Sequence, residues 1–197
     1  MSAVIIIVIV VLVVALIVIA GYNSLVRKRN RTKEAWSQID VELKRRHDLI
    51  PNLVASVKGY AAHESGTFEA VTASRAAAIS AGADTSPAAV ASAENALSSS
   101  LRTLFAVAEN YPALRAQEGF LALQEQLATS EDKIEYARRY YNTSVRDFNS
   151  ATQSFPWVLV AGPFGFRPFE FFETAAADRD TPVVDFSSPA PTLPTAS

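Results

Sequence analysis

The sequence has no cysteine, only two histidines and a formal net charge of −2. The missing cysteine excludes disulfide bonds, thiolate chemistry, cysteine-ligated metals and a lipidated cysteine anchor. The two histidines, His47 and His63, lie on one predicted helix and about 24 Å apart along its axis, so they cannot share a metal within one chain. The near-neutral charge gives no electrostatic argument for binding nucleic acid.

Catalytic motifs are missing as well. The sequence has no Gly-x-Ser-x-Gly motif and no phosphate-binding loop, and His63-Glu64 lacks the second histidine of a zincin motif. No residue set would activate water or a nucleophile beyond unassisted serines. We therefore expect a protein that is not an enzyme and uses no metal, cofactor or small-molecule substrate. We expect both histidines to be surface or capping residues.

The first feature that is present is a long apolar run. No charged or strongly polar residue occurs from Ala3 to Ala20. As a helix this run covers about 27 Å, and extended to Tyr22 it reaches about 30 Å, the thickness of a bilayer core. Tyr22 also suits the membrane–water interface. We predict that residues 1–22 form a single transmembrane anchor.

A cleavable signal peptide is the alternative interpretation of this run. Val18 and Ala20 satisfy the small-residue rule for a cut before Gly21. However, no basic residue precedes the run, and it is longer than the apolar core of a usual signal peptide. These two features favour an anchor that stays attached.

A basic cluster follows the anchor and predicts its orientation. By the positive-inside rule, the N-terminus should lie outside and the rest of the chain in the cytoplasm, as a single-pass protein of the cell membrane. The first three basic residues are also candidates for contact with lipid headgroups. The cluster consists of Arg27, Lys28, Arg29, Arg31 and Lys33.

Behind the anchor, residues 23–172 form about 150 residues, enough for one domain with a core. They are rich in Ala, Leu, Glu and Arg, which favours helices. A first helix is predicted from Tyr22 to Glu64, continuous with the anchor, and Gly66 should end it in a left-handed conformation. Its apolar stripe is interrupted by Arg46 alone and comprises Trp36, Ile39, Leu43, Ile50, Leu53, Val57 and Tyr60.

Pro51 lies inside this first helix. A proline there removes the backbone hydrogen bond to the carbonyl of His47 and should bend the helix.

Three further helices are predicted. Thr67 can cap a second helix that runs to about Ala81. Ser86 should cap a third that starts at Pro87, after a loop at 82–85. A fourth should run to about Ser154, with a weak point near Ser130. Its apolar residues recur every seven positions: Phe120, Leu127, Ile134, Tyr141 and Phe148.

These elements predict an all-α protein: a transmembrane helix followed by an antiparallel, up-and-down four-helix bundle with two long and two shorter helices. The long pair should extend beyond the short pair as a stalk. Because the first helix leaves the membrane, the fourth should return toward it. Residues 173–197 are polar and proline-rich, and we expect them to be disordered.

An apolar segment at 155–172 follows the fourth helix. Prolines and glycines interrupt it, and its core at 155–166 is too short to span a bilayer. It either packs on the end of the bundle or lies in the membrane interface, because the fourth helix delivers it there. The candidate lipid-facing residues in it are Trp157, Leu159, Phe164 and Phe166.

A dense charged group on the first helix is the candidate partner-binding site. It comprises Lys44, Arg45, Arg46, His47, Asp48 and Asn52. Because Arg46 falls on the apolar stripe, we expect it to pair with an acid from another helix, and Glu109 and Asp132 are the candidates. The alternative to a binding site is a structural ion pair between the helices.

Several motifs together resemble the signature of the LemA family, over about Ala3 to Phe172. The longest is WSQIDVELKRRHDLIPNLV at residues 36–54. The others are Tyr22-Asn23-Ser24-Leu25-Val26, Val57-Lys58-Gly59-Tyr60, His63-Glu64, Ala108-Glu109-Asn110-Tyr111-Pro112-Ala113-Leu114, Phe120-Leu121-Ala122-Leu123-Gln124, Ala137-Arg138-Arg139-Tyr140-Tyr141-Asn142, and Phe155-Pro156 followed by Phe164-Gly165-Phe166.

The resemblance implies a bacterial single-pass membrane protein with a cytoplasmic four-helix bundle and no settled biochemical activity. The family resembles, more distantly, a protein involved in forming magnetosome membranes, which favours a membrane-organising role. Gly119 departs from the pattern, since the family usually has asparagine at that position.

Two functions follow from these features. The first is a membrane-anchored scaffold or adaptor that binds an unknown membrane or cytoplasmic protein, with self-association into a homo-oligomer as a further expectation. The alternative is a membrane-organising or lipid-sensing protein that contacts the bilayer through residues 155–166.

Overall fold

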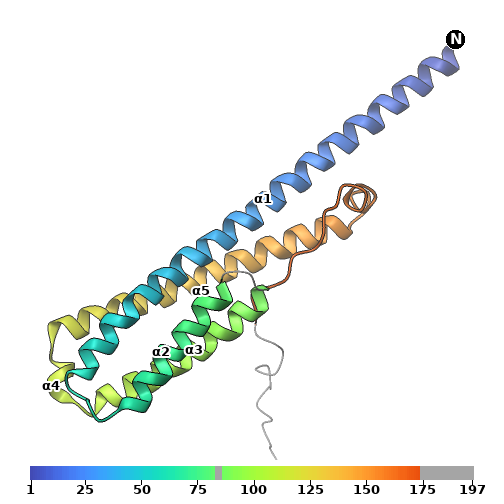
Figure 1. The fold of residues 1–197 in the computed structure, drawn as a ribbon. Helices are drawn as coiled ribbons and strands as arrows, with labels where there is room; N and C mark the ends of the chain where they lie inside the picture. Colours follow the sequence, from blue (N-terminus) through green and yellow to red (C-terminus); the bar gives the residue numbers. More distant parts are fainter. Residues whose placement is uncertain (83–85, 174–197) are drawn as a thin grey trace, which may run out of the picture.

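The computed structural model describes residues 1–82 and 86–173, and its regular elements are all helices (Figure 1). This confirms the predicted all-α class. The predicted disordered tail lies, from residue 174 on, outside the described residues. The helices are α1 (Ser2–Lys58), α2 (Ser65–Gly82), α3 (Pro87–Glu109), α4 (Pro112–Arg115), α5 (Glu118–Gln153) and α6 (Val158–Ala161).

The two long helices, α1 and α5, lie side by side and antiparallel (Figure 1). The Oγ1 of Thr32 donates to the carbonyl of Ser144 at 3.2 Å, and the Oγ of Ser130 donates to the carbonyl of Glu42 at 3.4 Å. Low numbers in α1 therefore meet high numbers in α5. The pair extends beyond the shorter α2–α3 hairpin on the side of the N-terminus, as the predicted stalk requires.

The apolar start of α1 stands apart from the rest of the structure. Between Val4 and Ile19 the large apolar side chains, Val18 excepted, are 47–66% exposed. Transfer of these side chains from water into an apolar medium is favourable, so their exposure to water would be costly. Among the described residues, α1 is the one helix that is long enough and apolar enough to cross a membrane. Its apolar start indicates membrane anchoring.

The core runs along the bundle as three clusters of buried side chains. The cluster farthest from the apolar start joins all the longer helices, and the middle one joins α1, α3 and α5. Most of the predicted stripe on α1 is buried, but Tyr60 is exposed because it lies beyond the end of α1. Representative residues are Leu53, Val57, Leu97, Leu104 and Phe120 in the far cluster, and Ile39, Val90, Ile134, Tyr141 and Phe172 in the middle one.

The end of α1 differs from the prediction. The helix ends at Lys58, not near Glu64, and α2 begins at Ser65. The amide of Ala61 donates to the carbonyl of Val57 at 2.9 Å, and this turn buries Ala61 in the core. Consequently Gly66 does not end a helix in a left-handed conformation but lies in the first turn of α2.

The predicted cap of α2 is also wrong, since Thr67 lies inside the first turn of that helix. An α2 that starts at Ser65 places Phe68, Val71 and Ala78 toward the core at helical spacing. By contrast, the start of α3 follows the prediction, because the Oγ of Ser86 accepts from the amide of Ala89 and Pro87 is the first helical residue.

The fourth predicted helix corresponds to α5, and the one-turn α4 precedes it. α5 continues without interruption through Ser130, so the predicted weak point is absent there; the Ser130 side chain is buried against α1. Gly119 lies in the first turn of α5, where an added Cβ would meet nothing within 4 Å. Pro51 lies within α1, which continues through it as a helix.

Candidate functional site

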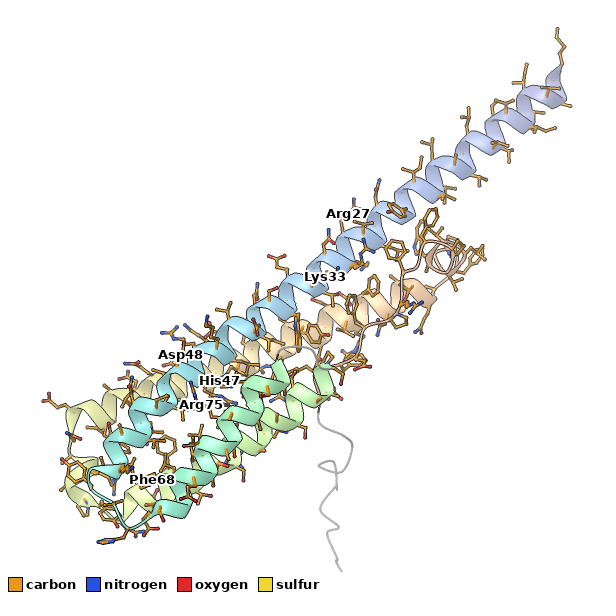
Figure 2. The ribbon with its side chains drawn as sticks, in the orientation of Figure 1. Arg27, Lys33, His47, Asp48, Phe68 and Arg75 are labelled. Carbon is orange, nitrogen blue, oxygen red and sulfur yellow. The ribbon has the colours of Figure 1, made fainter. Side chains whose placement is uncertain are left out.

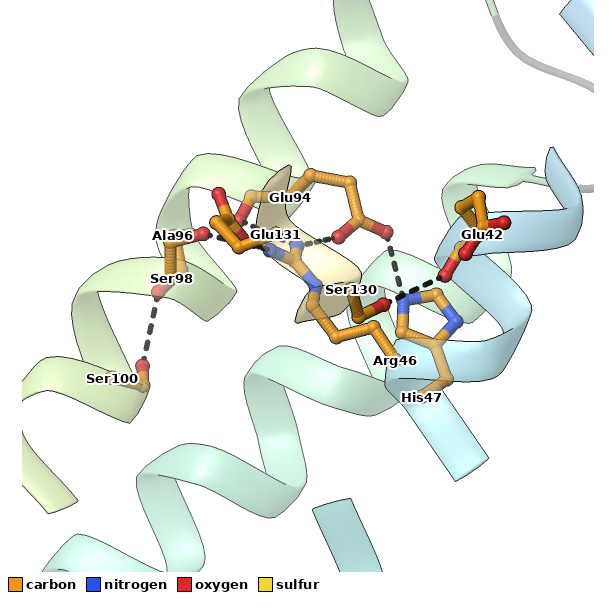
Figure 3. A network of polar contacts seen from close by, with 9 residues as sticks. All are labelled: Glu42, Arg46, His47, Glu94, Ala96, Ser98, Ser100, Ser130 and Glu131. Carbon is orange, nitrogen blue, oxygen red and sulfur yellow. Dashed lines mark hydrogen bonds and ion pairs between the residues drawn. The ribbon is translucent and has the colours of Figure 1, made fainter. Parts of the chain in front are cut away.

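Arg46 is buried in α1 and contacts two other helices (Figure 3). Its Nη2 pairs with the Oε2 of Glu94 on α3. Its Nη1 donates to the Oγ of Ser98, also on α3, at 3.1 Å and to the Oε2 of Glu131 on α5 at 2.5 Å. One guanidinium therefore links α1, α3 and α5, using the several donors of an arginine in one plane.

Glu94 is the buried acid at the centre of this group. Its Oε1 lies 2.8 Å from the Nε2 of His47, while its other oxygen accepts from Arg46. Burial alone would raise the pKa of Glu94, but the hydrogen bond from His47 and the charge of Arg46 together hold that pKa below its usual value. The carboxylate is thus ionised and satisfied by two neighbours on α1.

Arg75 adds the fourth helix to the group. Its Nε donates at 2.7 Å to the backbone carbonyl of His47 (Figure 2). In a regular helix this carbonyl would accept from the amide of residue 51, but Pro51 has no amide hydrogen. A side chain of α2 thereby satisfies an acceptor that the proline leaves free. We call Arg46, His47, Arg75, Glu94 and Glu131 the polar junction; it joins α1, α2, α3 and α5.

Two predictions about this region need correction. Arg46 does pair with acids from other helices, but they are Glu94 and Glu131, not Glu109 or Asp132. Glu109 lies at the far end of α3, about 22 Å from Glu94 along the helix, and Asp132 is one residue, or about 100°, around α5 from Glu131. Register between helices, which the sequence pattern leaves open, decides which acid is used.

His47 is the second correction, because it is buried rather than a surface residue. His63 is exposed and lies in the turn after α1. Among residues 1–82 and 86–173, no three His, Asp or Glu side chains are grouped so that they could hold a metal ion.

The candidate partner-binding residues separate into two sets. Arg46 and His47 point inward and belong to the polar junction. The other four are exposed on α1, and we call them the exposed stripe: Lys44, Arg45, Asp48 and Asn52.

The apolar residues 155–166, which we call the cap, pack where the apolar start of α1 meets the bundle. Trp157 lies so close to Gly21 that a Cβ added there would be 2.0 Å from its Cζ3. Tyr22 contacts the rings of Phe164 and Phe166, with centroids 5.1 and 5.6 Å apart. The cap therefore packs on the end of the bundle, as one of the two interpretations expected.

The cap also carries exposed apolar side chains. Phe155 is 80% exposed, Leu159 66% and Phe164 53%, whereas Phe166 is buried and Trp157 half-buried. Of the four candidate lipid-facing residues, only Leu159 and Phe164 are thus exposed.

The basic cluster after the apolar start is partly engaged with the protein. The guanidinium of Arg29 lies 5.1 Å from the centroid of the Phe166 ring, and the Nε of Arg31 donates to the Tyr140 hydroxyl at 3.0 Å. Arg27 is exposed and Lys28 half-buried on α1. Figure 2 shows Arg27 and Lys33 on the stretch of α1 between the apolar start and the bundle.

After the cap, residues 167–173 run back along α5 as an extended segment that we call the strap. The hydroxyl of Tyr141 donates to the carbonyl of Glu170 at 2.9 Å, and burial, with the charge of Glu170, raises the pKa of Tyr141 to about 12. The ring of Phe172 is buried against Trp36 and Tyr141. Nothing in our sequence analysis predicted the strap.

The signal that could have revealed the strap is a pair of asparagines seven residues apart on α5. Asn149 donates to the carbonyl of Phe169 and accepts from its amide, both at 2.9 Å. Asn142 makes the same two bonds with Phe172. Asparagine is a poor helix former, so its recurrence inside a long helix indicates a role for the side chain.

Comparison with known proteins places these features in a family context. The model of the LemA family matches residues 35–186. Magnetosome protein MamQ 2 of Paramagnetospirillum magneticum is 25% identical over 186 residues, which cover 83% of this chain and 68% of that protein, and MamQ of Magnetospirillum gryphiswaldense matches to the same extent. Protein LemA of Metamycoplasma hominis is 27% identical over 164 residues, covering 83% of this chain and 74% of that protein.

Proposed function

The chain belongs to the LemA family, and from that premise we propose that it is a membrane-anchored scaffold that binds a membrane or cytoplasmic protein through its exposed stripe. The family match indicates no known catalytic activity. Binding, rather than catalysis, is therefore the function that its architecture supports best.

The observation that carries this proposal is the division of the charged group on α1. Arg46 and His47 are buried and bonded within the polar junction, whereas Lys44, Arg45 and Asp48 are exposed beside them. The junction fixes the rotation and height of α1 relative to its neighbours, so the exposed side chains are held on a rigid surface. Rigid presentation lowers the entropy cost of binding a partner.

The stripe also lies at a defined distance from the membrane. α1 is one helix from its apolar start to Lys58, and Lys44 follows Tyr22 by about 33 Å along it. A partner bound there would be held at that height above the bilayer. The stripe is polar and contains an arginine, which suits a reversible protein interface more than an obligate one.

The experiment is affinity purification of the full chain from membranes in mild detergent. Lys44→Glu with Arg45→Glu should abolish recovery of a specific partner. The matched control is Arg139→Glu with Arg146→Glu, which reverses two exposed charges on α5. Loss of the partner with both double variants, or with neither, would contradict the proposal.

Contact between the cap and the bilayer is a second candidate function. The cap packs against Gly21 and Tyr22, at the end of the apolar start, and carries four large apolar side chains that are exposed: Phe155, Val158, Leu159 and Phe164. Interfacial aromatics are favoured at this depth.

A depth measurement tests the second candidate. Because the chain has no cysteine, a fluorophore can be attached to Leu159→Cys alone, in nanodiscs, and exposed to lipids with quenchers at known depths. Quenching at Leu159→Cys but not at Leu121→Cys, an exposed site on the first turn of α5, would support bilayer contact. Equal, weak quenching at both sites would end this idea.

We further propose that the anchor remains attached and spans the cell membrane once, with the N-terminus outside and the bundle in the cytoplasm. Five basic residues after the apolar run support this orientation. The packing of Val18 and Gly21 beside the cap favours an uncleaved chain. A reporter active only in the cytoplasm, fused after Ser197, should be active; an inactive but well-expressed fusion would contradict the orientation.

A further inference from the structure

A groove lies beside the polar junction, where α1 faces the connected ends of α2 and α3. Its volume is about 390 Å³. Trp36, Leu43, Ile79 and Val90 supply apolar walls, with His47 and Glu94 at its base. Ile79 is 45% exposed, so its side chain is open to a ligand that enters the groove.

The strap leads the chain directly to this groove. Phe169 is bound to Asn149 and Phe172 to Asn142, so the strap runs antiparallel to α5, away from the apolar start. Phe172 packs in the same core cluster as Val90, and its ring lies 5.8 Å from that of Trp36. Trp36 and Val90 both line the groove, so the chain arrives at its edge.

The sequence after the strap contains one compact apolar group, Val183, Val184 and Phe186. Nine residues separate Glu173 from Val183, and they can reach up to about 30 Å. The distance from Trp36 to His47 along α1 is only about 16 Å. The match to the LemA family ends at residue 186, so it includes this apolar group and stops directly after it.

We propose that Val183, Val184 and Phe186 dock in the groove beside Trp36 and Ile79. Three apolar side chains within four residues suit an apolar groove, and Lys44, which also lines it, offers a partner of opposite charge for the carboxylate of Asp185. The groove also includes Asp48, so a docked segment covers part of the exposed stripe.

This inference stands whether or not the stripe binds a partner. If it does, the chain's own segment competes for the same surface, and the partner must displace it. The segment would then act as an internal competitor, whose local concentration is set by the short connection to Glu173.

Engineered cysteines test the docking without ambiguity, because the chain has none of its own. The full chain carrying Ile79→Cys and Val184→Cys is oxidised in nanodiscs, and the disulfide is assigned by mass spectrometry. Ile79 is partly exposed, so this change should not disturb folding. A disulfide within one chain should form roughly tenfold faster than in the control pair Val41→Cys with Val184→Cys, because docking raises the local concentration of the thiols. Val41 is exposed on α1 between Trp36 and His47, within the same reach of the strap, but it lines a different pocket.

A third variant tests the apolar contact itself. Val183→Asp with Phe186→Asp, added to the Ile79→Cys pair, should reduce the rate to that of the control. Equal rates for the two cysteine pairs would overturn the proposal. A disulfide between residues 79 and 184 of different chains as the main product would also overturn it, since a second copy would then occupy the groove.

Discussion

The carboxamide of Asn142 binds both hydrogen-bonding groups of the Phe172 backbone. Its Nδ2 donates to the carbonyl at 3.2 Å, and its Oδ1 accepts from the amide at 2.9 Å. Asn149 does the same for Phe169. Seven residues of helix rise about 10.5 Å and three extended residues span about 10 Å, so the two asparagines match the spacing of the two phenylalanines.

Replacing Asn142 should therefore release the end of the strap. Asn142→Ala leaves a partly buried amide and carbonyl without partners, which costs about 1–3 kcal/mol. Amide exchange at Phe172 should become correspondingly faster, as measured by hydrogen exchange with mass spectrometry. Thr143→Ala is the control, since that exposed side chain bonds only within α5. Unchanged exchange in the strap of Asn142→Ala would contradict its role.

Removing Arg46 should destabilise the bundle far more than removing its neighbour. Arg46→Met leaves the buried Glu94 without the positive charge of the guanidinium, at a cost of about 3–5 kcal/mol. Arg45→Met, at an exposed position, should change the free energy of unfolding by less than about 0.5 kcal/mol. Guanidinium unfolding in detergent, followed by circular dichroism, measures both. Similar losses in the two variants would mean that the polar junction does not stabilise the fold.

A double variant separates the ion pair from the packing. Adding Glu94→Met to Arg46→Met removes the uncompensated charge, and it should recover a large part of the lost stability. If the second change instead deepened the loss, burial of an unpaired Glu94 would not be the cause of the Arg46→Met effect.

The lowered pKa of Glu94 predicts how stability depends on pH. A carboxyl group whose pKa is lower in the folded state stabilises the fold at pH values above 4.5, its ordinary pKa. This stabilisation disappears as the pH falls through the lowered pKa of the folded state. Glu94→Gln should therefore be less stable than the unchanged chain near neutral pH. The difference should shrink in acid below pH 4.5. A difference that stays constant or grows in acid would have the wrong sign.

Gly21 should be needed for the position of the cap. An added Cβ would be 2.0 Å from the Cζ3 of Trp157, so Gly21→Ala must displace the ring and speed amide exchange in residues 155–166. Gly162→Ala, where an added Cβ meets nothing within 4 Å, is the control. Gly21→Ala combined with Trp157→Ala should exchange no faster than Trp157→Ala alone; a further increase would point to a cause other than this contact.

Local signals in the sequence predicted much of the fold. Ser86-Pro87 fixed the start of α3 because a cap and a proline act within one turn. The seven-residue spacing from Phe120 to Phe148 identified the inward face of α5, and those five residues are all buried. The free carbonyl of His47 also followed from Pro51 alone.

Features set by tertiary register could not be predicted. Which acids pair with Arg46 depends on the register of α3 and α5 against α1. A register of α5 shifted by one residue would place Asp132 where Glu131 lies. The hydrogen bond from Arg75 to the carbonyl of His47 likewise depends on the register of α2 against α1. The bonds of Asn142 and Asn149 require a strap that has no periodic signal of its own.

The central claim is that the exposed stripe holds a partner protein above the membrane, and photocrosslinking in intact membranes tests it most directly. A photoreactive amino acid at Asp48 should give a discrete adduct with another protein. The same group at Glu125, which is exposed on α5, should not. Adducts of equal yield at both positions, or none with protein at Asp48, Arg45 or Asn52, would contradict the claim.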